Sequence, residues 1–151
     1  MKNQELNIPF IIGNIKRDFF IFRNGIIANS LKKLYSDDKI IIGLNAPQFM
    51  ELAKKYPKNL DLGLALWKEK NNRESRLFSL YIIPSEKLDK ETAKSMIYDV
   101  ESCEEAEFLS FKLLKHLQFG KELYEELSKE NECSPMSCYC LNMLKKNLDQ
   151  I

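Results

Sequence analysis

The sequence predicts an all-α protein, built as a short α-solenoid in which helix pairs stack one after another. Glycine and proline are scarce, with five of each in 151 residues, whereas β-sandwiches and barrels use many of both in their turns. Most of the chain consists of short amphipathic segments that begin at residues typical of helix N-caps. Each predicted helix start lies 27 to 32 residues before the next start but one, which is the period expected of a repeated helix pair.

The first third of the chain has the weakest signals. Residues 14–35 are predicted to form one helix that is broken near Gly25, or two short helices in the same range. Residues 40–43 contain three consecutive isoleucines, and β-branched residues of this kind favour a strand. Because no second strand is predicted to pair with this run, we interpret it as a buried connector.

The later helices have recognisable first residues. Asn45 is followed by a proline and then by a glutamine three positions on, and Ser102 is followed three positions on by Glu105, so both are capping-box patterns. Asn59 and Asp89 are predicted to cap two further helices. The predicted helix starts lie near residues 45, 59, 72, 89, 102, 120 and 134. A plain helical bundle stays open as an alternative to the solenoid, and residues 1–151 are expected to form a single domain.

The composition is that of a globular chain. Hydrophobic residues make up 44% and charged residues 30%, which excludes an intrinsically disordered protein. No apolar run reaches the 18 residues of a transmembrane helix, so no contact with a membrane is expected. The N-terminal stretch lacks the basic-then-apolar order of a signal peptide, and we therefore expect a cytoplasmic location.

The charge is nearly balanced overall but unevenly distributed. The formal net charge is +1, whereas dedicated nucleic-acid-binding domains are usually more basic. Residues 1–75 contain 13 basic and 8 acidic residues, and residues 76–151 contain 10 basic and 14 acidic ones. The densest acidic segment comprises Asp99, Glu101, Glu104, Glu105 and Glu107. Because such a segment repels phosphate, it favours a protein partner over DNA.

The cysteines do not form a recognisable metal site. Cys133, Cys138 and Cys140 follow a C-x4-C-x-C spacing that lacks the C-x2-C pair of zinc knuckles, and His116 is the only histidine. No metal and no other cofactor are therefore expected. Cys140 falls on the apolar stripe of a predicted helix, and the role of the three-cysteine cluster stays open.

Residues 43–114 contain four features in a characteristic order. These are Gly43 with a short loop to Pro47, the pair Leu66-Trp67, the sequence Glu74-Ser75-Arg76, and the acidic segment 99–102 that leads into a helix. With this order of features, the segment resembles the DNA alkylation repair family (AlkD-like, HEAT-like repeats). The resemblance implies a right-handed solenoid that holds duplex DNA on its concave face. It also implies a glycosylase that removes N3- and N7-alkylated purines, using a carboxylate and aromatic faces to stabilise positive charge on the sugar.

The resemblance assigns candidate catalytic residues to the helix that follows Ser102. Glu107 matches the catalytic aspartate of the family, and Glu104 matches an aspartate that precedes it. Cys103 stands where the family has a tryptophan, and the single tryptophan of this chain, Trp67, falls on an apolar stripe. We therefore expect the glycosylase activity to be absent or very slow.

Basic side chains on alternate helices are candidate contacts to DNA phosphates. The predicted nucleic-acid-binding residues are Arg73, Arg76, Lys112, Lys115, Lys145 and Lys146. For Glu74 and Arg76, an inter-helix salt bridge that holds repeats in register is the competing interpretation. For the whole chain, the alternative function is a non-catalytic helical-repeat module that binds a protein partner.

Overall fold

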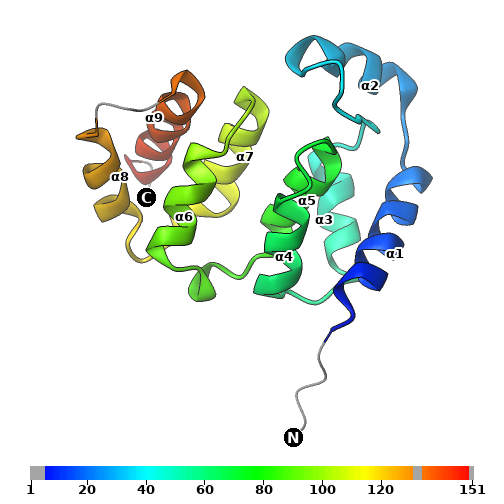
Figure 1. Ribbon diagram of the computed structural model, residues 1–151, viewed down its shortest axis with the longest axis horizontal. Helices are drawn as coiled ribbons and strands as arrows, with labels where there is room; N and C mark the ends of the chain where they lie inside the picture. The colour runs from blue at the N-terminus through cyan, green and yellow to red at the C-terminus, as the bar shows by residue number, and fades with distance from the viewer. Residues whose placement is uncertain (1–5, 131–133, 150–151) are drawn as a thin grey trace, which may run out of the picture. The chain divides into compact units, whose positions relative to one another are not determined.

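The computed structural model describes residues 6–130 and 134–149, and the regular elements in these ranges are helices (Figure 1). The α-helices are α1 Ile8–Ile21, α2 Gly25–Leu31, α3 Ala46–Ala53, α4 Leu60–Trp67, α5 Arg73–Ile82, α6 Lys90–Tyr98, α7 Cys103–Lys112, α8 Gly120–Ser128 and α9 Pro135–Asp149. Short 3₁₀ helices lie at Lys32–Leu34, Ser85–Lys87 and Leu114–His116. The all-α prediction is confirmed. Among the described helices, none combines the length and the apolar character needed to span a bilayer.

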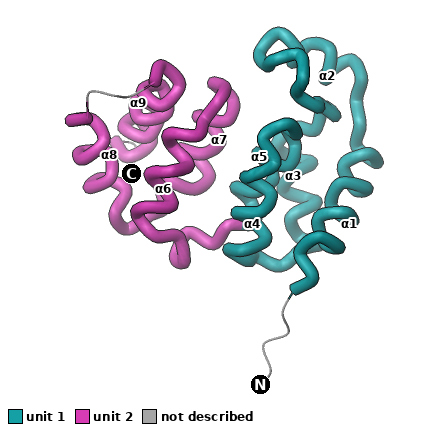
Figure 2. The backbone as a smooth tube through the Cα atoms, in the orientation of Figure 1, with its two compact units in different colours: residues 1–82 teal, residues 83–151 magenta. Residues whose placement is uncertain are grey.

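The chain divides into two compact units (Figure 2). Unit 1 comprises residues 1–82 and contains α1 to α5, and unit 2 comprises residues 83–151 and contains α6 to α9. Each unit has its own buried apolar core.

The predicted helix caps from Asn45 onward are confirmed by hydrogen bonds. Asn45 Oδ1 accepts from the Gln48 amide at 3.0 Å, and Gln48 Oε1 accepts from the Asn45 amide at 3.0 Å. Asn59 Oδ1 accepts from the Leu62 amide at 2.9 Å, and Asp89 caps α6 in the same way. Because these bonds join residues three positions apart, the capping residues alone predict the starts of α3, α4, α6 and α7 to within one residue.

The prediction for residues 14–35 needs a correction. Two separate helices form, as one of the two alternatives stated, but α1 begins at Ile8, six residues before the predicted start. Asn7 caps α1 by accepting from the Phe10 amide at 3.3 Å, and Pro9 lies in the first turn, where its missing amide hydrogen is not needed. Asn24 caps α2.

The isoleucine run at residues 40–43 is a connector, as predicted. Ile42 and Leu44 are buried, whereas Ile40 is exposed. The Ile40 backbone makes one isolated parallel bridge to Asn72, in which the Arg73 amide donates to the Ile40 carbonyl at 3.0 Å. The connector therefore lies against the start of α5 without forming a sheet in the described residues.

The core of unit 1 is an aromatic cluster shared by three helices. Phe19 of α1, Phe49 of α3 and Phe78 of α5 are fully buried. The Phe19 and Phe78 rings meet edge to face with centroids 5.6 Å apart, and the Phe49 and Phe78 rings are stacked at 6.2 Å. Such pairs add stabilisation beyond the area that they bury, so this cluster fixes how α1, α3 and α5 pack.

In unit 2, alternate helices run parallel to each other. Along α7 and α9, Ala106 pairs with Cys140, and Ser110 accepts a hydrogen bond from Asn147 at 2.6 Å, so both partners advance in the same direction. Two salt bridges between α6 and the region of α8 show the same order. They join Lys90 to Glu122 at 3.0 Å and Lys94 to Glu130 at 2.9 Å.

The conformation of Gly43 gives a test of the connector. Its φ is +105°, and a Cβ built there would lie 2.5 Å from the Asn24 carbonyl oxygen. We expect Gly43→Ala to lower the free energy of unfolding by about 1–3 kcal/mol, as measured by urea unfolding followed by circular dichroism.

Gly13→Ala is the matched control for Gly43→Ala. Gly13 lies inside α1, and a Cβ there would meet nothing within 4 Å. Alanine stabilises a helix interior by about 0.5–1 kcal/mol relative to glycine, so this variant should change stability in the opposite direction. Equal effects of the two substitutions would contradict the proposed conformational requirement at Gly43.

Candidate nucleic-acid interface

Two of the six predicted phosphate-binding residues lie inside the protein. Arg73 is 3% exposed and Arg76 is 0% exposed, although both belong to α5, which was expected to offer them to DNA. Each guanidinium has partners within unit 1. Arg73 Nη1 donates to the Leu44 carbonyl at 3.1 Å, and the Arg76 guanidinium lies 3.8 Å from the centre of the Trp67 ring. In this structure both residues therefore serve the core of unit 1.

Glu74 is the centre of this buried polar cluster. Its Oε1 accepts from the Ile42 amide at 2.5 Å and from the Gly43 amide at 2.9 Å, and Arg73 Nη1 donates to the same oxygen at 3.2 Å. Glu74 Oε2 is buried and has no hydrogen-bond partner among the described residues. Burial raises the pKa of the Glu74 carboxyl above its ordinary value, although Arg73 and the two amides act to lower it.

The contacts of Glu74 differ from the competing interpretation, a salt bridge between helices. The Glu74 carboxylate ties the connector to α5 through hydrogen bonds from backbone amides, and its ion pair with Arg73 lies within the same helix. Arg76 stacks on Trp67 in a cation–π contact between α5 and α4. Trp67 is buried, as its place on the apolar stripe predicted.

The predicted catalytic carboxylates lie at the start of α7 in unit 2. Glu107 is exposed, and its Oε1 accepts a hydrogen bond from the Tyr139 hydroxyl of α9 at 2.6 Å. This bond, together with the negative charge of Glu107, raises the pKa of Tyr139 to about 12. Glu104 is half-buried and Cys103 is exposed, so the structure shows no aromatic ring at the position that the resemblance assigns to tryptophan.

The capping box predicted at Ser102 forms, but the hydrogen bond to its glutamate side chain is shifted by one residue. Ser102 Oγ accepts from the Glu105 amide at 3.1 Å, as predicted. The Glu105 carboxylate reaches one residue further back than expected, and its Oε2 accepts from the Glu101 amide at 2.8 Å. Glu105 is fully buried by this arrangement and is a structural residue of the α7 start.

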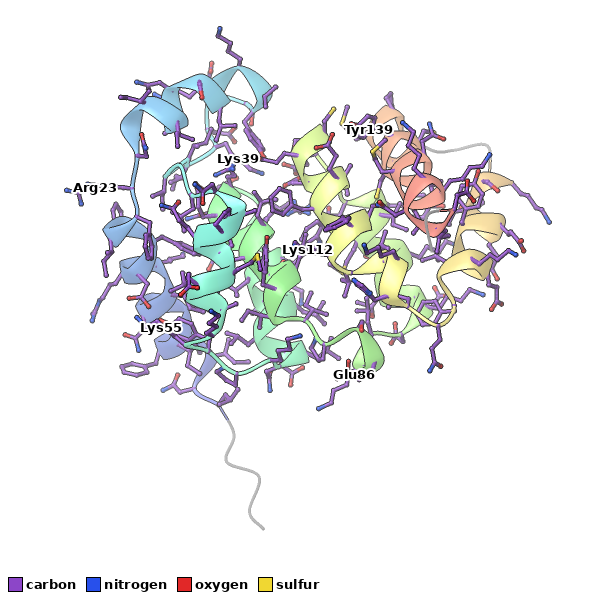
Figure 3. The ribbon with its side chains drawn as sticks, turned by 180° about the vertical axis from the view of Figure 1, so that it is seen from behind. Arg23, Lys39, Lys55, Glu86, Lys112 and Tyr139 are labelled. Carbon is purple, nitrogen blue, oxygen red and sulfur yellow. The ribbon has the colours of Figure 1, made fainter. Side chains whose placement is uncertain are left out.

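The other four predicted basic residues lie toward one end of unit 2. Lys112 and Lys115 follow Ser110, and Lys145 and Lys146 precede Asn147. Because the Asn147 side chain donates to Ser110 Oγ, the C-terminal ends of α7 and α9 lie at the same end of the unit. Figure 3 shows Lys112 on α7, away from Tyr139 on α9. We call Lys112, Lys115, Lys145 and Lys146 the basic end of unit 2.

Phe111 is a residue of this region that the sequence analysis did not identify. Its ring is 48% exposed, Lys115 Nζ lies 3.7 Å from the ring centre, and Lys112 Nζ lies 5.4 Å from it. Exposed aromatic rings beside basic side chains are typical of surfaces that bind single-stranded nucleic acid, whose unpaired bases stack on the ring. The sequence signal was an aromatic residue off the apolar stripe: Phe111 lies between Leu109 and Leu113 in the sequence but on a different side of the helix.

The cysteines give no metal site in the part of the chain that the structure describes. Cys138 is exposed, Cys140 is fully buried on the apolar face of α9 as predicted, and Cys133 lies outside the described residues. No group of three or more histidine, cysteine, aspartate or glutamate residues with metal-binding geometry occurs within residues 6–130 and 134–149.

Comparisons of the chain with protein-family models, with curated proteins and with solved structures found no match.

The burial of Glu74 predicts an unusual pH dependence. Since its pKa is raised in the folded chain, the folded chain keeps a proton at pH values where the unfolded chain has released it. The contribution of Glu74 to the free energy of unfolding is therefore complete below the ordinary pKa of 4.5 and falls as pH rises above it, by at most about 1.4 kcal/mol per pH unit. Urea unfolding between pH 4.5 and 7 should show this slope in the wild type and lose it in Glu74→Gln.

Glu51→Gln is a suitable control for this measurement, because Glu51 is an exposed carboxylate in the same unit. Its substitution should leave the pH slope unchanged. If wild type and Glu74→Gln show identical slopes, the buried carboxyl does not titrate in this range and the assigned direction is wrong.

Proposed function

We propose that the chain is a DNA alkylation repair-like helical-repeat protein, which binds the backbone of duplex DNA and has lost most or all glycosylase activity. The family part of the proposal rests on the resemblance of residues 43–114, and the observation that carries the DNA-binding part is the basic end of unit 2. Its four lysines gather where α7 and α9 end, and two of them flank the exposed ring of Phe111. Lysines bind phosphates as point charges, so such contacts supply affinity without reading the base sequence.

The sequence separation of contacting residues within each unit supports a solenoid of HEAT-like pairs, and its right-handedness rests on the resemblance alone. In unit 1, Phe49 contacts Phe19 and Phe78 at sequence separations of 30 and 29 residues, although the Phe19 and Phe78 rings, 59 residues apart, also meet with centroids at 5.6 Å. In unit 2, Lys90 and Tyr139 each pair with a glutamate 32 residues away. Partners at one repeat distance are what a stack of similar helix pairs produces, because each pair packs on the next.

The site around Glu107 supports the loss of catalysis. A glycosylase of the implied kind needs a carboxylate and aromatic faces placed to within about an ångström of the reacting sugar. Glu107 is engaged by the Tyr139 hydroxyl, Cys103 supplies no ring, and Trp67 is buried in unit 1 beneath Arg76. The carboxylate is present at the surface, but no aromatic partner at position 103 accompanies it.

The acidic start of α7 favours the alternative function, a module that binds a protein partner. Glu101 and Glu107 are exposed at this end of α7, and Glu104 is half-buried. A surface of this charge fits a basic segment of another protein and opposes DNA. The two functions use opposite ends of the same helix, so variants of the lysines and of the glutamates distinguish them.

DNA binding by the basic end should depend strongly on salt. Four phosphate contacts give a slope of about −3 to −4 in a plot of log K against log salt concentration. Lys112→Ala and Lys115→Ala should each make the slope less negative by about one, as measured by fluorescence anisotropy with a labelled duplex.

Lys90→Ala is the matched control for DNA binding, because Lys90 is a unit 2 lysine whose charge is already paired with Glu122 and Glu126. It should leave the slope unchanged. If wild type does not bind duplex DNA at low salt, or if Lys90→Ala weakens binding as much as Lys112→Ala, the DNA proposal fails. Binding of a basic peptide that is lost in Glu107→Gln would then support the alternative.

The proposed loss of catalysis has a direct measurement. We expect release of N7-methylated purine from duplex DNA to stay at the background rate, and Glu107→Gln to make no difference, because position 103 lacks the aromatic ring. Robust release by the wild type would show that Cys103 does not abolish activity. Release that also falls by about 100-fold or more in Glu107→Gln would identify Glu107 as the catalytic carboxylate.

A further inference from the structure

Phe111 of α7 is an exposed aromatic residue for which binding to duplex phosphates has no use. Its ring is 48% exposed, although the preceding residue, Ser110, is fully buried and accepts a hydrogen bond from Asn147 of α9. Lysines that hold a duplex by its phosphates need no aromatic neighbour. In a duplex the faces of the bases are stacked on one another, and only their edges are open in the grooves. A ring at the protein surface therefore finds no base face on intact duplex DNA.

The Phe111 ring and Lys146 lie on one face of unit 2. Phe111 follows Glu107 by one turn of α7, so the two side chains share a side of that helix. Glu107 accepts a hydrogen bond from Tyr139 of α9, and Lys146 follows Tyr139 by two turns on the same side of α9. The residue before Phe111 and the residue after Lys146 are hydrogen-bonded to each other. Phe111 and Lys146 are therefore also at the same level of the two helices.

We propose that the basic end of unit 2 binds single-stranded DNA, with one unpaired base stacked on Phe111 and the neighbouring phosphates held by Lys112, Lys115 and Lys146. Lys145 adds positive charge at the same end. Every base has a π face, so a site of this kind tolerates different sequences. The inference rests on the DNA-binding part of the proposed function, because the same lysines hold the phosphates, and it names the unpaired strand as the preferred form of DNA.

Two of the lysines already contact the ring. Lys115 Nζ lies 3.7 Å from the centre of the Phe111 ring, and Lys112 Nζ lies 5.4 Å from it. A cation–π contact at an exposed site is weaker than the stacking of a base on an aromatic ring. An incoming base therefore displaces the Lys115 ammonium group, and the flexible four-carbon stem of the lysine carries that group to a phosphate. The lysine thus exchanges a ring contact for a contact with the backbone of the bound strand.

The acidic start of α7 sets the direction in which the strand leaves the ring. Glu107 is exposed one turn before Phe111 on the same side of α7, and its carboxylate repels phosphate. The lysines lie beyond Phe111, toward the C-terminal ends of α7 and α9. The strand therefore extends from the ring over these two helix ends and away from the Glu107–Tyr139 pair.

Fluorescence anisotropy with two labelled probes tests the inference on the full chain. One probe is an oligothymidine of about 12 nucleotides, and the other is a duplex of the same length. At about 0.15 M salt, the wild type should bind the oligothymidine more tightly than the duplex. Phe111→Ala should weaken binding of the oligothymidine by about 5- to 150-fold, because it removes the stacked base contact, and should leave the affinity for the duplex unchanged.

The salt dependence separates stacking from charge. Phe111→Ala removes no charge, so the slope of log K against log salt for the oligothymidine should keep its wild-type value of about −3 while the affinity falls at every salt concentration. Lys115→Ala should make the same slope less negative by about 0.7. Phe111→Trp should retain binding of the oligothymidine, whereas Phe111→Leu, which is apolar but has no ring, should lose it.

Phe20→Ala is the matched control, because Phe20 is a phenylalanine of similar exposure that lies on α1 in unit 1. It should leave both affinities unchanged. The inference is wrong if the wild type prefers the duplex, if Phe111→Ala weakens oligothymidine binding no more than Phe20→Ala does, or if Phe111→Leu binds as tightly as Phe111→Trp. Duplex binding that depends on Lys112 would still support the proposed function in those cases. Phe111-dependent binding of the oligothymidine alone overturns the duplex proposal and supports the inference, and binding of neither probe overturns both.

Discussion

The fold of unit 1 depends on one buried carboxylate. The end of the connector, from Ile42 to Leu44, is buried without a neighbouring strand, so its backbone groups need other partners. Glu74 accepts hydrogen bonds from two of its amides, and Arg73 donates to the Leu44 carbonyl, so one turn of α5 satisfies both donors and acceptors. Burial favours the protonated form of Glu74, and the neighbouring Arg73 guanidinium offsets part of the cost of ionising it.

The sequence predicted the parts of the fold that depend on short-range interactions. Caps such as Asn45, Asn59 and Ser102 act on residues three positions away, so they could be identified without knowing the rest of the structure. The position of the connector against α5 depends on contacts about 30 residues apart, and no local pattern encodes them. The early start of α1 was missed because its outer face is apolar, which hides the periodicity of a surface helix.

The same difference between local and long-range interactions explains where the predicted site residues lie in the structure. Arg73 and Arg76 resembled phosphate-binding residues because charge is visible in a sequence, whereas the partners that bury them, Trp67 and the connector, come from other elements. Lys112 and Lys115 are half-buried and lie off the apolar stripe of α7 and the 3₁₀ helix after it, which is a local property. Phe111 was overlooked because an aromatic residue in a helix is more often part of a core than of a surface.

The burial of Trp67 beneath Arg76 has a consequence for how the chain is observed in solution. It is the only tryptophan of the 151 residues, and it belongs to unit 1. Tryptophan fluorescence therefore reports on the unfolding of unit 1 and not of unit 2, whereas the helical signal in circular dichroism averages over both units. If tryptophan fluorescence and circular dichroism give the same unfolding curve, the chain unfolds in one cooperative transition. If the two curves separate, the two units unfold independently. The sequence thus carries its own reporter of whether its two units are one thermodynamic body or two.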